Sequence, residues 1–321
     1  TEEDALAGLY GAYTETNGYW GPLGRLYLLM GEMNADDMKQ SPIVSDVIQW
    51  DNFTYSNEIT NGLWSNCYDG INKCNEVIKY TEEIEFNNPG EKADIIAEAK
   101  ALRGVYYYQL VRAMGGVPLY TTPTVGFDEV KKPRVEQEKI YSQIFADLNS
   151  AVQELTPTNP PGRIGADIAN AMLARIHLYR GNYSDALAYA TKVINSGRYG
   201  LFEDYGDIFH SENDNGIEHI WQVQYLSGEV HNNTARDCAP RAIAGEYKES
   251  YFPEPVSGQF APHKNFIEEA PDCYRTSVTI SDRYEHYFYA DSTIKMQEVY
   301  GDIFPNYISK FEDEDKDNEH F

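Results

Sequence analysis

The histidines and cysteines of this 321-residue chain lack the spacings that metal binding and nucleophilic catalysis require. The seven histidines include no His-x-x-x-His pair and the four cysteines no Cys-x-x-Cys pair, which are common signatures of zinc sites. The sequence also has no Gly-x-Ser-x-Gly nucleophile turn and no phosphate-binding glycine loop. A glycosidase needs only two carboxylates about 5 to 10 Å apart, and 51 acidic residues leave that arrangement open. Because no acidic pair is flanked by aromatic sequence, we predict that the chain is not an enzyme.

Two irregular stretches instead combine aromatic rings with polar side chains, which is the mixture that a sugar requires. A sugar ring presents flat C–H faces and a fringe of hydroxyls, so its site needs aromatic platforms beside amide, carboxylate or arginine groups. The first stretch spans residues 50–57, and the second follows Tyr225. The predicted ligand-binding side chains in these stretches are Trp50, Asn52, Tyr55, Tyr225, His231, Asn232, Tyr247 and Tyr251.

The four tryptophans are expected to divide between the ligand face and the core. Trp50 lies in irregular sequence, which favours a ligand platform over a core position. Trp64 falls on a helical stripe and Trp221 shares a predicted strand face with Val223, so both are predicted to be core residues. Trp20 is assigned to neither group.

The charge of the chain excludes two classes of partner. The formal net charge is −25, with 51 acidic and 26 basic residues, whereas nucleic acids and anionic membrane faces require clustered Lys and Arg. The 26 tyrosines suit a neutral polar ligand, because a phenol offers an apolar face and a hydroxyl together. The alternative is that the tyrosines fill helix packing layers, since many of them occur at helical spacing.

No cofactor is predicted, and the cysteines leave the redox compartment open. The acidic tail at 313–319 resembles a calcium loop but lacks its turn glycine and closing Glu, so we expect a solvated acidic run. A structural calcium ion elsewhere stays an alternative without a placed site. Cys67 and Cys74 are seven residues apart in helical sequence, about 10 Å along the axis, which is too far for a disulfide. They are predicted to be small buried hydrophobes, and the sequence does not decide whether Cys238 and Cys273 pair.

Apolar periodicity predicts the helices that must position these side chains. A capping box at Thr1 and Asp4 begins a short amphipathic helix. Residues 18–57 lose the periodicity and are predicted to form a long binding loop. Further helices are predicted near 63–78, 91–114 and 140–152, one strand at 219–225, and irregular structure from about 226 to 300.

Residues 166–197 are predicted to form a tetratricopeptide-like helix pair, because a Gly181-x-Tyr183-x-x-Ala186 turn joins two apolar stripes. Ser184 is the predicted cap of the second helix. The predicted packing positions are Ala171, Arg175, Leu178 and Tyr179 in the first helix and Ala186, Leu187, Ala190, Val193 and Ile194 in the second. The predicted fold class is therefore all-α, with tetratricopeptide-like helix pairs, a loop-rich aromatic insertion and minor β structure. We predict a helical scaffold at 1–199 and a loop-rich ligand-face region at 200–321.

Four segments, in this order along the chain, resemble the SusD/RagB family of starch-utilisation lipoproteins. The segment at 98–119 (EAKALRGVYYYQLVRAMGGVPL) resembles the hallmark of that family, and the 166–197 helix pair resembles its tetratricopeptide unit. Residues 218–225 and 272–280 resemble a following strand and a short acidic-to-Arg motif. The resemblance implies an outward-facing outer-membrane lipoprotein that captures oligosaccharides, polysaccharides or other nutrients for a TonB-dependent transporter.

The resemblance adds one site residue and two expectations about the ends of the chain. Asp37 matches an acidic position near the ligand face of the family, although a helix cap or a solvated turn explains it equally well. The chain lacks the lipid-bearing N-terminus, so membrane contact is expected only through an anchor absent here. The resemblance also implies later helical segments, so we expect either that the chain is a fragment or that ordered sequence follows residue 321. The alternative function is a tetratricopeptide scaffold for peptides, which would place exposed aromatic rings along a helical groove rather than on loops.

Overall fold

The computed structural model describes residues 1–17, 21–24, 31, 35, 38–40, 57–126, 129–225, 260–262, 266, 269–281, 283–285, 293–295 and 307–308. The chain divides into two compact units. The first, called here the helical unit, consists of Thr1–Asn17, Asn61–Leu201 and Asn215–Val223. The second consists of Gly18–Thr60, Phe202–Asp214 and Gln224–Phe321. The predicted functional division at residues 199 and 200 stays a prediction.

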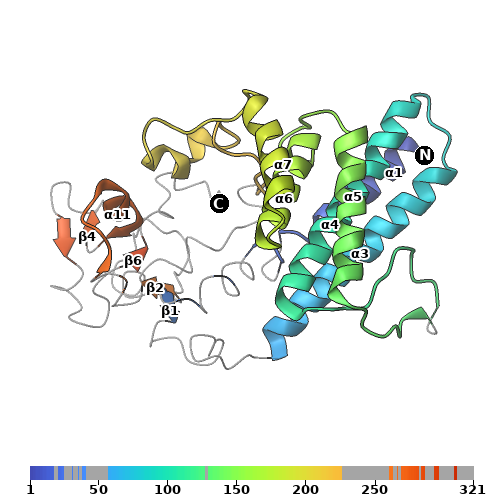
Figure 1. Cartoon of the computed structure of the whole chain (residues 1–321), viewed down its shortest axis with the longest axis horizontal. Coiled ribbons are helices and arrows are strands. Elements are labelled where there is room, and N and C mark those ends of the chain that lie inside the picture. The colour runs from blue at the N-terminus through green and yellow to red at the C-terminus, as the bar shows by residue number, and fades with distance from the viewer. Residues whose placement is uncertain are drawn as a thin grey trace, which may run out of the picture. The chain divides into compact units, whose positions relative to one another are not determined.

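Three N-terminal helices build the first part of the helical unit (Figure 1). Helix α1 begins at the predicted capping box, in which the Thr1 side chain accepts from the Asp4 backbone N–H. Helix α4 begins after Asn88, whose side chain accepts from the Gly90 N–H, and it ends at Gly115 with a φ of 72°. A left-handed φ favours glycine at this stop. The bounds are Glu2–Tyr13 for α1, Asn57–Glu83 for α3 and Pro89–Met114 for α4.

These helices bury a continuous apolar core. Leu9 from α1, Val77 from α3 and Ile95 from α4 belong to one buried cluster. Cys67 and Cys74 are fully buried in α3, which confirms that they are small buried hydrophobes. The Tyr106 side chain is also fully buried, and its hydroxyl donates to the Ala12 carbonyl at 2.6 Å. Part of the tyrosine content therefore fills helix packing layers.

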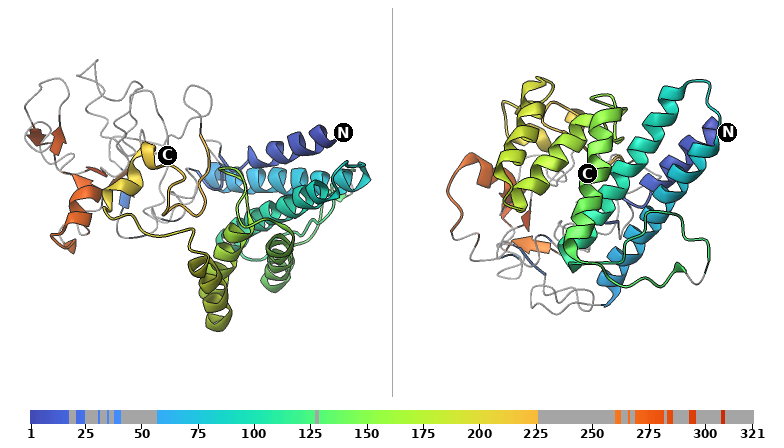
Figure 2. Two further views of the ribbon diagram at one scale, coloured as in Figure 1. Left: turned by 90° about the horizontal axis from the view of Figure 1, so that it is seen from above. Right: turned by 45° about the vertical axis from the view of Figure 1, so that its right-hand side comes forward.

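The remaining helices stack in chain order, with α4 against α5, α5 against α6 and α6 against α7 (Figures 1 and 2). Gly181 turns between α6 and α7 with a φ of 76°, which confirms the predicted tetratricopeptide-like turn. The predicted cap was wrong, because Asn182 is the N-cap and the last helix already begins at Tyr183. The bounds are Gln137–Glu154 for α5, Ala166–Tyr179 for α6 and Tyr183–Asn195 for α7.

The packing stripes predicted for the α6–α7 pair were partly wrong. Leu178 and Tyr179 are 55% and 74% exposed, and Leu187 and Ile194 are 69% and 71% exposed. Arg175 is exposed as well, whereas Ala171 and Ala190 are half-buried. The buried positions include Leu173, Ile176, Ala186 and Val193. Apolar residues lie on more than one face of both helices, so spacing alone could not identify the face that α5 covers.

The second unit contains short antiparallel strand pairs and short helices. β1 pairs with β2 so that Lys39 lies opposite Ala261, β3 pairs with β6, and β4 pairs with β5. The strand bounds are Met38–Gln40, Phe260–Pro262, Ile280–Ser281, Arg283–Glu285, Thr293–Lys295 and Tyr307–Ile308 for β1 to β6. The described helices are η3 at Gly206–Phe209, η4 at Ser211–Asn213 and α11 at Tyr274–Thr279.

The fold class is as predicted, helical with minor β structure, but the strand expected at 219–225 does not form. These residues pair with none of the described strands; instead the Trp221 indole donates to the Gly162 carbonyl of the loop between α5 and α6. An alternating apolar pattern needs a neighbouring strand to become a ladder. None of the described helices has the length and apolarity to cross a membrane.

Candidate functional site

Only one of the nine predicted ligand-binding residues lies within the described part of the chain. Tyr225 is half-buried, and burial raises the pKa of its phenol to about 12, so the hydroxyl stays protonated at neutral pH. The other eight lie outside the described residues and stay predictions: Asp37, Trp50, Asn52, Tyr55, His231, Asn232, Tyr247 and Tyr251. Trp20 and the acidic tail at 313–319 also lie outside them.

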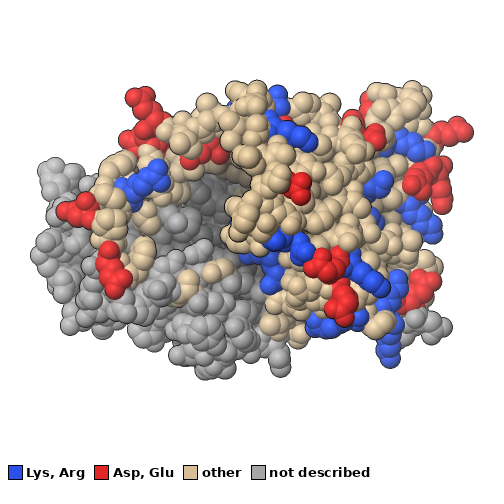
Figure 3. All heavy atoms as spheres, in the orientation of Figure 1, with Lys and Arg blue, Asp and Glu red and all other residues tan. Residues whose placement is uncertain are grey.

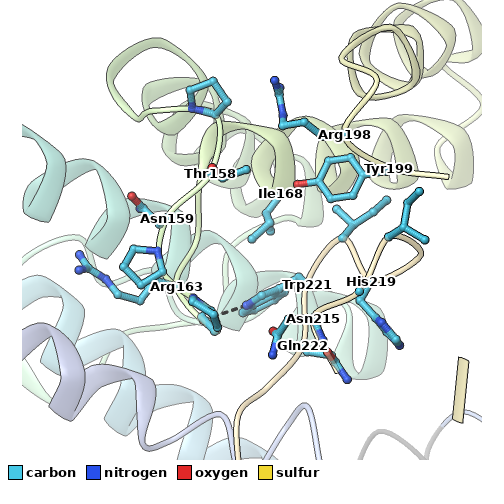
Figure 4. Close-up of a pocket in the computed structure, with 17 residues that line it drawn as sticks. Thr158, Asn159, Arg163, Ile168, Arg198, Tyr199, Asn215, His219, Trp221 and Gln222 are labelled. Atoms are coloured by element: carbon cyan, nitrogen blue, oxygen red, sulfur yellow. Dashed lines mark hydrogen bonds between the residues drawn. The ribbon is translucent and has the colours of Figure 1, made fainter. Parts of the chain in front are cut away.

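A cavity of about 330 Å³ in the helical unit, called here the Trp221 pocket, combines aromatic and polar side chains (Figure 4). Three segments line it: the loop between α5 and α6, the residues that follow α7, and the segment at 215–222. Figure 4 shows Tyr199 and Trp221 on different sides of the space, with Asn215, His219 and Gln222 on the same segment as Trp221. The labelled lining residues are Thr158, Asn159, Arg163, Ile168, Arg198, Tyr199, Asn215, His219, Trp221 and Gln222.

Trp221 is half-buried, so the prediction that it is a core residue was wrong. Its indole nitrogen donates to the Gly162 carbonyl at 3.0 Å, which satisfies the polar edge and fixes the ring against the loop. Gly162 turns this loop with a φ of 82°. An indole held in this way offers an apolar surface to a ligand without having to become ordered on binding.

A buried carboxylate anchors the loop that carries Gly162. Glu98 on α4 is fully buried and accepts from Arg163 at 3.1 and 2.6 Å, and from the Tyr13 hydroxyl at 2.6 Å. The same tyrosine oxygen accepts from the Ile164 N–H at 2.8 Å. Burial and the neighbouring Glu98 raise the pKa of Tyr13 well above its usual value, so it stays a neutral donor. The family-like segment at 98–119 therefore begins with a residue that positions the pocket.

The second arginine of the pocket is also paired. Arg198 donates to both carboxylate oxygens of Asp167, at 2.6 and 2.9 Å. Tyr199 follows directly, and burial together with Asp167 raises the pKa of its phenol, so its hydroxyl is neutral. With Arg163 held by Glu98 and Arg198 held by Asp167, the two cations of the lining are each balanced by a carboxylate. The pocket is therefore suited to a neutral polar ligand rather than a charged one.

Sequence reasoning missed most of this pocket, although one signal was present. The loop reads Pro157-Thr-Asn-Pro-Pro-Gly-Arg163, a cluster of turn-forming residues between two helices. Such a cluster predicts a turn but gives no sign that a tryptophan 59 residues later contacts it.

A larger cavity of about 530 Å³ lies elsewhere in the helical unit, between α3 and the segment that follows α4, and is called here the Trp64 pocket. Trp64 is half-buried and lines it, so the prediction that this residue belongs to the core was wrong as well. The prediction that His177 is a packing or surface residue is confirmed, because its ring stacks between Phe145 and Tyr189 with centroid distances of 4.4 and 5.5 Å. No group of three or more His, Cys, Asp or Glu in the described part of the chain could hold a metal ion.

The stacked helix pairs define a helical protein whose described part contains two cavities lined by aromatic and polar side chains. A family model described as "Starch-binding associating with outer membrane" matches residues 11–178, just over half of the chain. The chain belongs to this SusD-like family, which confirms the resemblance found in its sequence.

The curated relatives are longer than the part of them that aligns with this chain. SusD-like protein P38 from Formosa agariphila is 27% identical over 294 residues, which are 87% of this chain and 54% of that protein. SusD-like protein P25 from the same organism is 25% identical over 234 residues, which are 69% of this chain and 44% of that protein. The chain thus spans about half the length of these curated relatives.

Solved structures share the fold. A SusD superfamily protein from Parabacteroides distasonis matches 96% of this chain and 69% of its own length, with a TM-score of 0.80 and 24% identity. A laminarin-binding SusD-like protein matches 96% of this chain and 72% of its own, with a TM-score of 0.78 and 23% identity. Surface glycan-binding protein A from Bacteroides uniformis matches 97% of this chain and 69% of its own, with a TM-score of 0.78 and 20% identity.

Proposed function

We propose that this chain binds an oligosaccharide in the Trp221 pocket and takes part in capturing glycans at the outer membrane, without covalent chemistry. The observation that carries the proposal is a half-buried indole, fixed by the Gly162 carbonyl, in a polar cavity whose two arginines are already paired. A sugar ring would stack on Trp221 while its hydroxyls exchange hydrogen bonds with polar groups of the lining such as the Tyr199 hydroxyl. Family membership supports this proposal, and the names of two proteins of the same fold mention laminarin or glycan binding.

Transfer of the bound glycan to a TonB-dependent transporter, from a lipid-anchored position on the outward-facing surface, is part of the same proposal. The family description supports association with the outer membrane, whereas the transporter and the anchor rest on the sequence resemblance. The predicted ligand residues outside the described part of the chain, such as Trp50 and Tyr251, would extend the saccharide contact on loops.

Affinity is expected to be modest. Exposed polar contacts gain little over the hydrogen bonds that water already supplies, so dissociation constants on the order of micromolar to millimolar are expected. A glycan with several repeating units would compensate by engaging more than one contact region at once.

One observation favours the alternative of a peptide-binding scaffold. Tyr179 and Tyr183 are 74% and 69% exposed on the α6–α7 pair, beside the exposed Leu187. Aromatic and aliphatic side chains on a helical surface can hold an amphipathic peptide. The two functions therefore use different residues of the same unit and can be separated by substitution.

Calorimetry against a panel of neutral oligosaccharides, including laminarin and starch fragments, tests the proposal. Trp221→Ala should weaken the best ligand by about tenfold, because an aromatic contact contributes on the order of 1 to 2 kcal/mol. Trp221→Phe keeps a ring but loses the indole donor, so an intermediate loss is expected. Tyr183→Ala is the matched control, because it removes an exposed aromatic ring outside the pocket.

The results separate the candidates. Full binding by a folded Trp221→Ala protein would show that this pocket is not the saccharide site. Binding of peptides but of no glycan, with loss in Tyr183→Ala, would establish the scaffold function instead. New reducing ends after incubation with the glycan would contradict capture without chemistry.

A further inference from the structure

The Trp64 pocket contains a second aromatic platform that the proposed function does not use. Its walls come from α3 and from residues 118–124 and 130–132, and its volume is about 530 Å³, within the range of ligand sites. Trp64 and Tyr68 have centroids 4.8 Å apart, and Tyr68 meets Tyr120 edge to face at 5.6 Å. Three aromatic side chains, two from α3 and one from the segment after α4, thus line this cavity.

Internal contacts hold these rings in place. The Tyr68 hydroxyl donates to the Pro118 carbonyl at 2.7 Å, and the Tyr120 hydroxyl donates to the Val130 carbonyl at 2.6 Å. The Arg134 guanidinium lies 5.5 Å from the Trp64 ring centre and donates to the Met114 and Gly116 carbonyls. Both phenol hydroxyls are occupied, so the ring surfaces are what the platform offers, and little ordering is needed on binding.

Hydrogen bonds from side chains of α3 hold the wall formed by residues 120–124 in place. Asn75 donates to the carbonyls of Tyr120 and Thr122, both at 3.2 Å, and the Thr124 N–H donates to the Asn72 side chain at 3.0 Å. These bonds tie an irregular segment to α3. The cavity is therefore held by defined hydrogen bonds on both sides and is more than a gap beneath a loop.

The charge of this pocket differs from that of the Trp221 pocket. Lys131 and Lys132 line it as exposed residues, and the Lys132 ammonium lies 4.5 Å from the Tyr120 ring centre. No carboxylate among the described residues forms a salt bridge with either lysine. Asp69 is the acidic residue of the lining, and the nearby Lys73 is paired with Glu15 at 2.5 Å.

The visible face of the described helices carries Lys, Arg, Asp and Glu side chains interleaved (Figure 3), although the chain as a whole has a net charge of −25. A pair of adjacent lysines without described carboxylate partners, beside a fixed aromatic platform, is a feature that packing does not require. Lysine ammonium groups attract carboxylate and sulfate groups.

We propose that the Trp64 pocket is a second saccharide site, selective for sugars that carry a carboxylate or sulfate group. The sugar ring lies on Trp64 and Tyr68, and its anionic group meets Lys131 and Lys132 at the rim. The hydroxyl of Thr124, a lining residue, supplies a hydrogen bond to a sugar hydroxyl. The site would let one chain bind a glycan with both neutral and acidic residues, and its existence does not depend on the Trp221 pocket.

Titration calorimetry with trigalacturonic acid at low salt, beside neutral maltotriose, tests the proposal. Wild-type protein is expected to prefer the acidic trisaccharide, and the preference should fall as salt is added. Lys131→Ala/Lys132→Ala should weaken trigalacturonic acid by about fivefold or more, because two exposed charge contacts are lost. Lys139→Ala, an exposed lysine of α5 outside the pocket, is the matched control and should leave binding unchanged.

Two tryptophan variants extend the test. Trp64→Ala should abolish binding of the acidic sugar, whereas Trp221→Ala should leave it intact. Equal affinity of the double lysine variant and the wild type, or no detectable binding of trigalacturonic acid at millimolar concentration, would overturn the proposal. Loss of acidic-sugar binding in Trp221→Ala alone would also overturn it, because that result assigns the ligand to the other pocket. The lysines are exposed, so the double variant keeps the test valid if Trp64→Ala does not fold.

Discussion

Breaking the buried ion pair between Arg103 and Asp147 is expected to destabilise the helical unit far more than breaking an exposed arginine–carboxylate pair. Arg103 on α4 donates to both carboxylate oxygens of Asp147 on α5, at 2.9 and 2.7 Å, and both side chains are nearly inaccessible to solvent. The same guanidinium donates to Asn75 at 2.7 Å and to the Thr121 carbonyl at 3.3 Å. The pair thus joins α3, α4, α5 and one wall of the Trp64 pocket.

Asp147→Asn removes one charge with almost no change in volume. It leaves no cavity, and the loss comes from an arginine that stays charged and buried without its anion. Breaking a buried pair in this way costs about 3 to 5 kcal/mol, and the lower end is expected here because the amide oxygen still accepts one hydrogen bond. Set against a typical domain stability of about 5 to 15 kcal/mol, this is a large fraction.

Glu138→Gln is the matched control. Arg180 contacts both oxygens of Glu138 at 2.8 Å, but the glutamate side chain is 75% exposed. Exposed pairs contribute about 0 to 1 kcal/mol, because water already solvates both charges. The two substitutions therefore compare the loss of an arginine–carboxylate pair at two degrees of burial.

Urea unfolding followed by far-ultraviolet circular dichroism gives both free energies of unfolding, provided that the transition is two-state. The expected losses are about 3 kcal/mol for Asp147→Asn and less than about 1 kcal/mol for Glu138→Gln. Similar losses in the two variants would refute the reasoning, since burial would then not be what makes the pair costly to break. A double variant, Arg103→Met/Asp147→Leu, should be less destabilised than Asp147→Asn, because it removes both charges.

Two further predictions concern close packing and pH. Gly70→Ala should destabilise the protein by about 1 to 3 kcal/mol despite its better helix propensity, because the new methyl group would lie 2.5 Å from the buried Tyr106 ring. Gly11→Ala is the control, because open space surrounds Gly11, and it should stabilise the protein by up to about 1 kcal/mol. Thermal or urea unfolding measures both effects. A stabilised Gly70→Ala protein would contradict that contact. Burial lowers the pKa of His177, against the opposing effect of Asp185, so the unfolded state binds this proton more readily and stability should fall as pH drops below about 6.5. His177→Gln should show a smaller fall between pH 7.5 and 5.5, and an equal fall would exclude His177 as its source.

The sequence was sufficient to predict the helices and the family. Apolar periodicity, the capping box at Thr1 and the glycine stop at 115 act within a few residues along the chain, so they can be recognised without knowing the rest of the fold. The burial of Cys67 and Cys74 followed from the same helical stripe. The segment at 98–119, whose sequence resembles the family hallmark, contains Glu98 and Arg103, and each of these residues anchors a loop of one pocket.

The tertiary structure alone decided which aromatic residues face a cavity. Trp64 and Trp221 have the apolar spacing of core residues, yet each is half-buried beside a pocket. Their neighbours come from remote segments of the chain. Arg134 lies over the Trp64 ring, and the Gly162 carbonyl accepts from the Trp221 indole. The exposed faces of α6 and α7 were misassigned for the same reason. The spacing of apolar residues predicts which side chains share a helix face. Whether that face is buried depends on which element packs against it, and that element is often far away in the sequence.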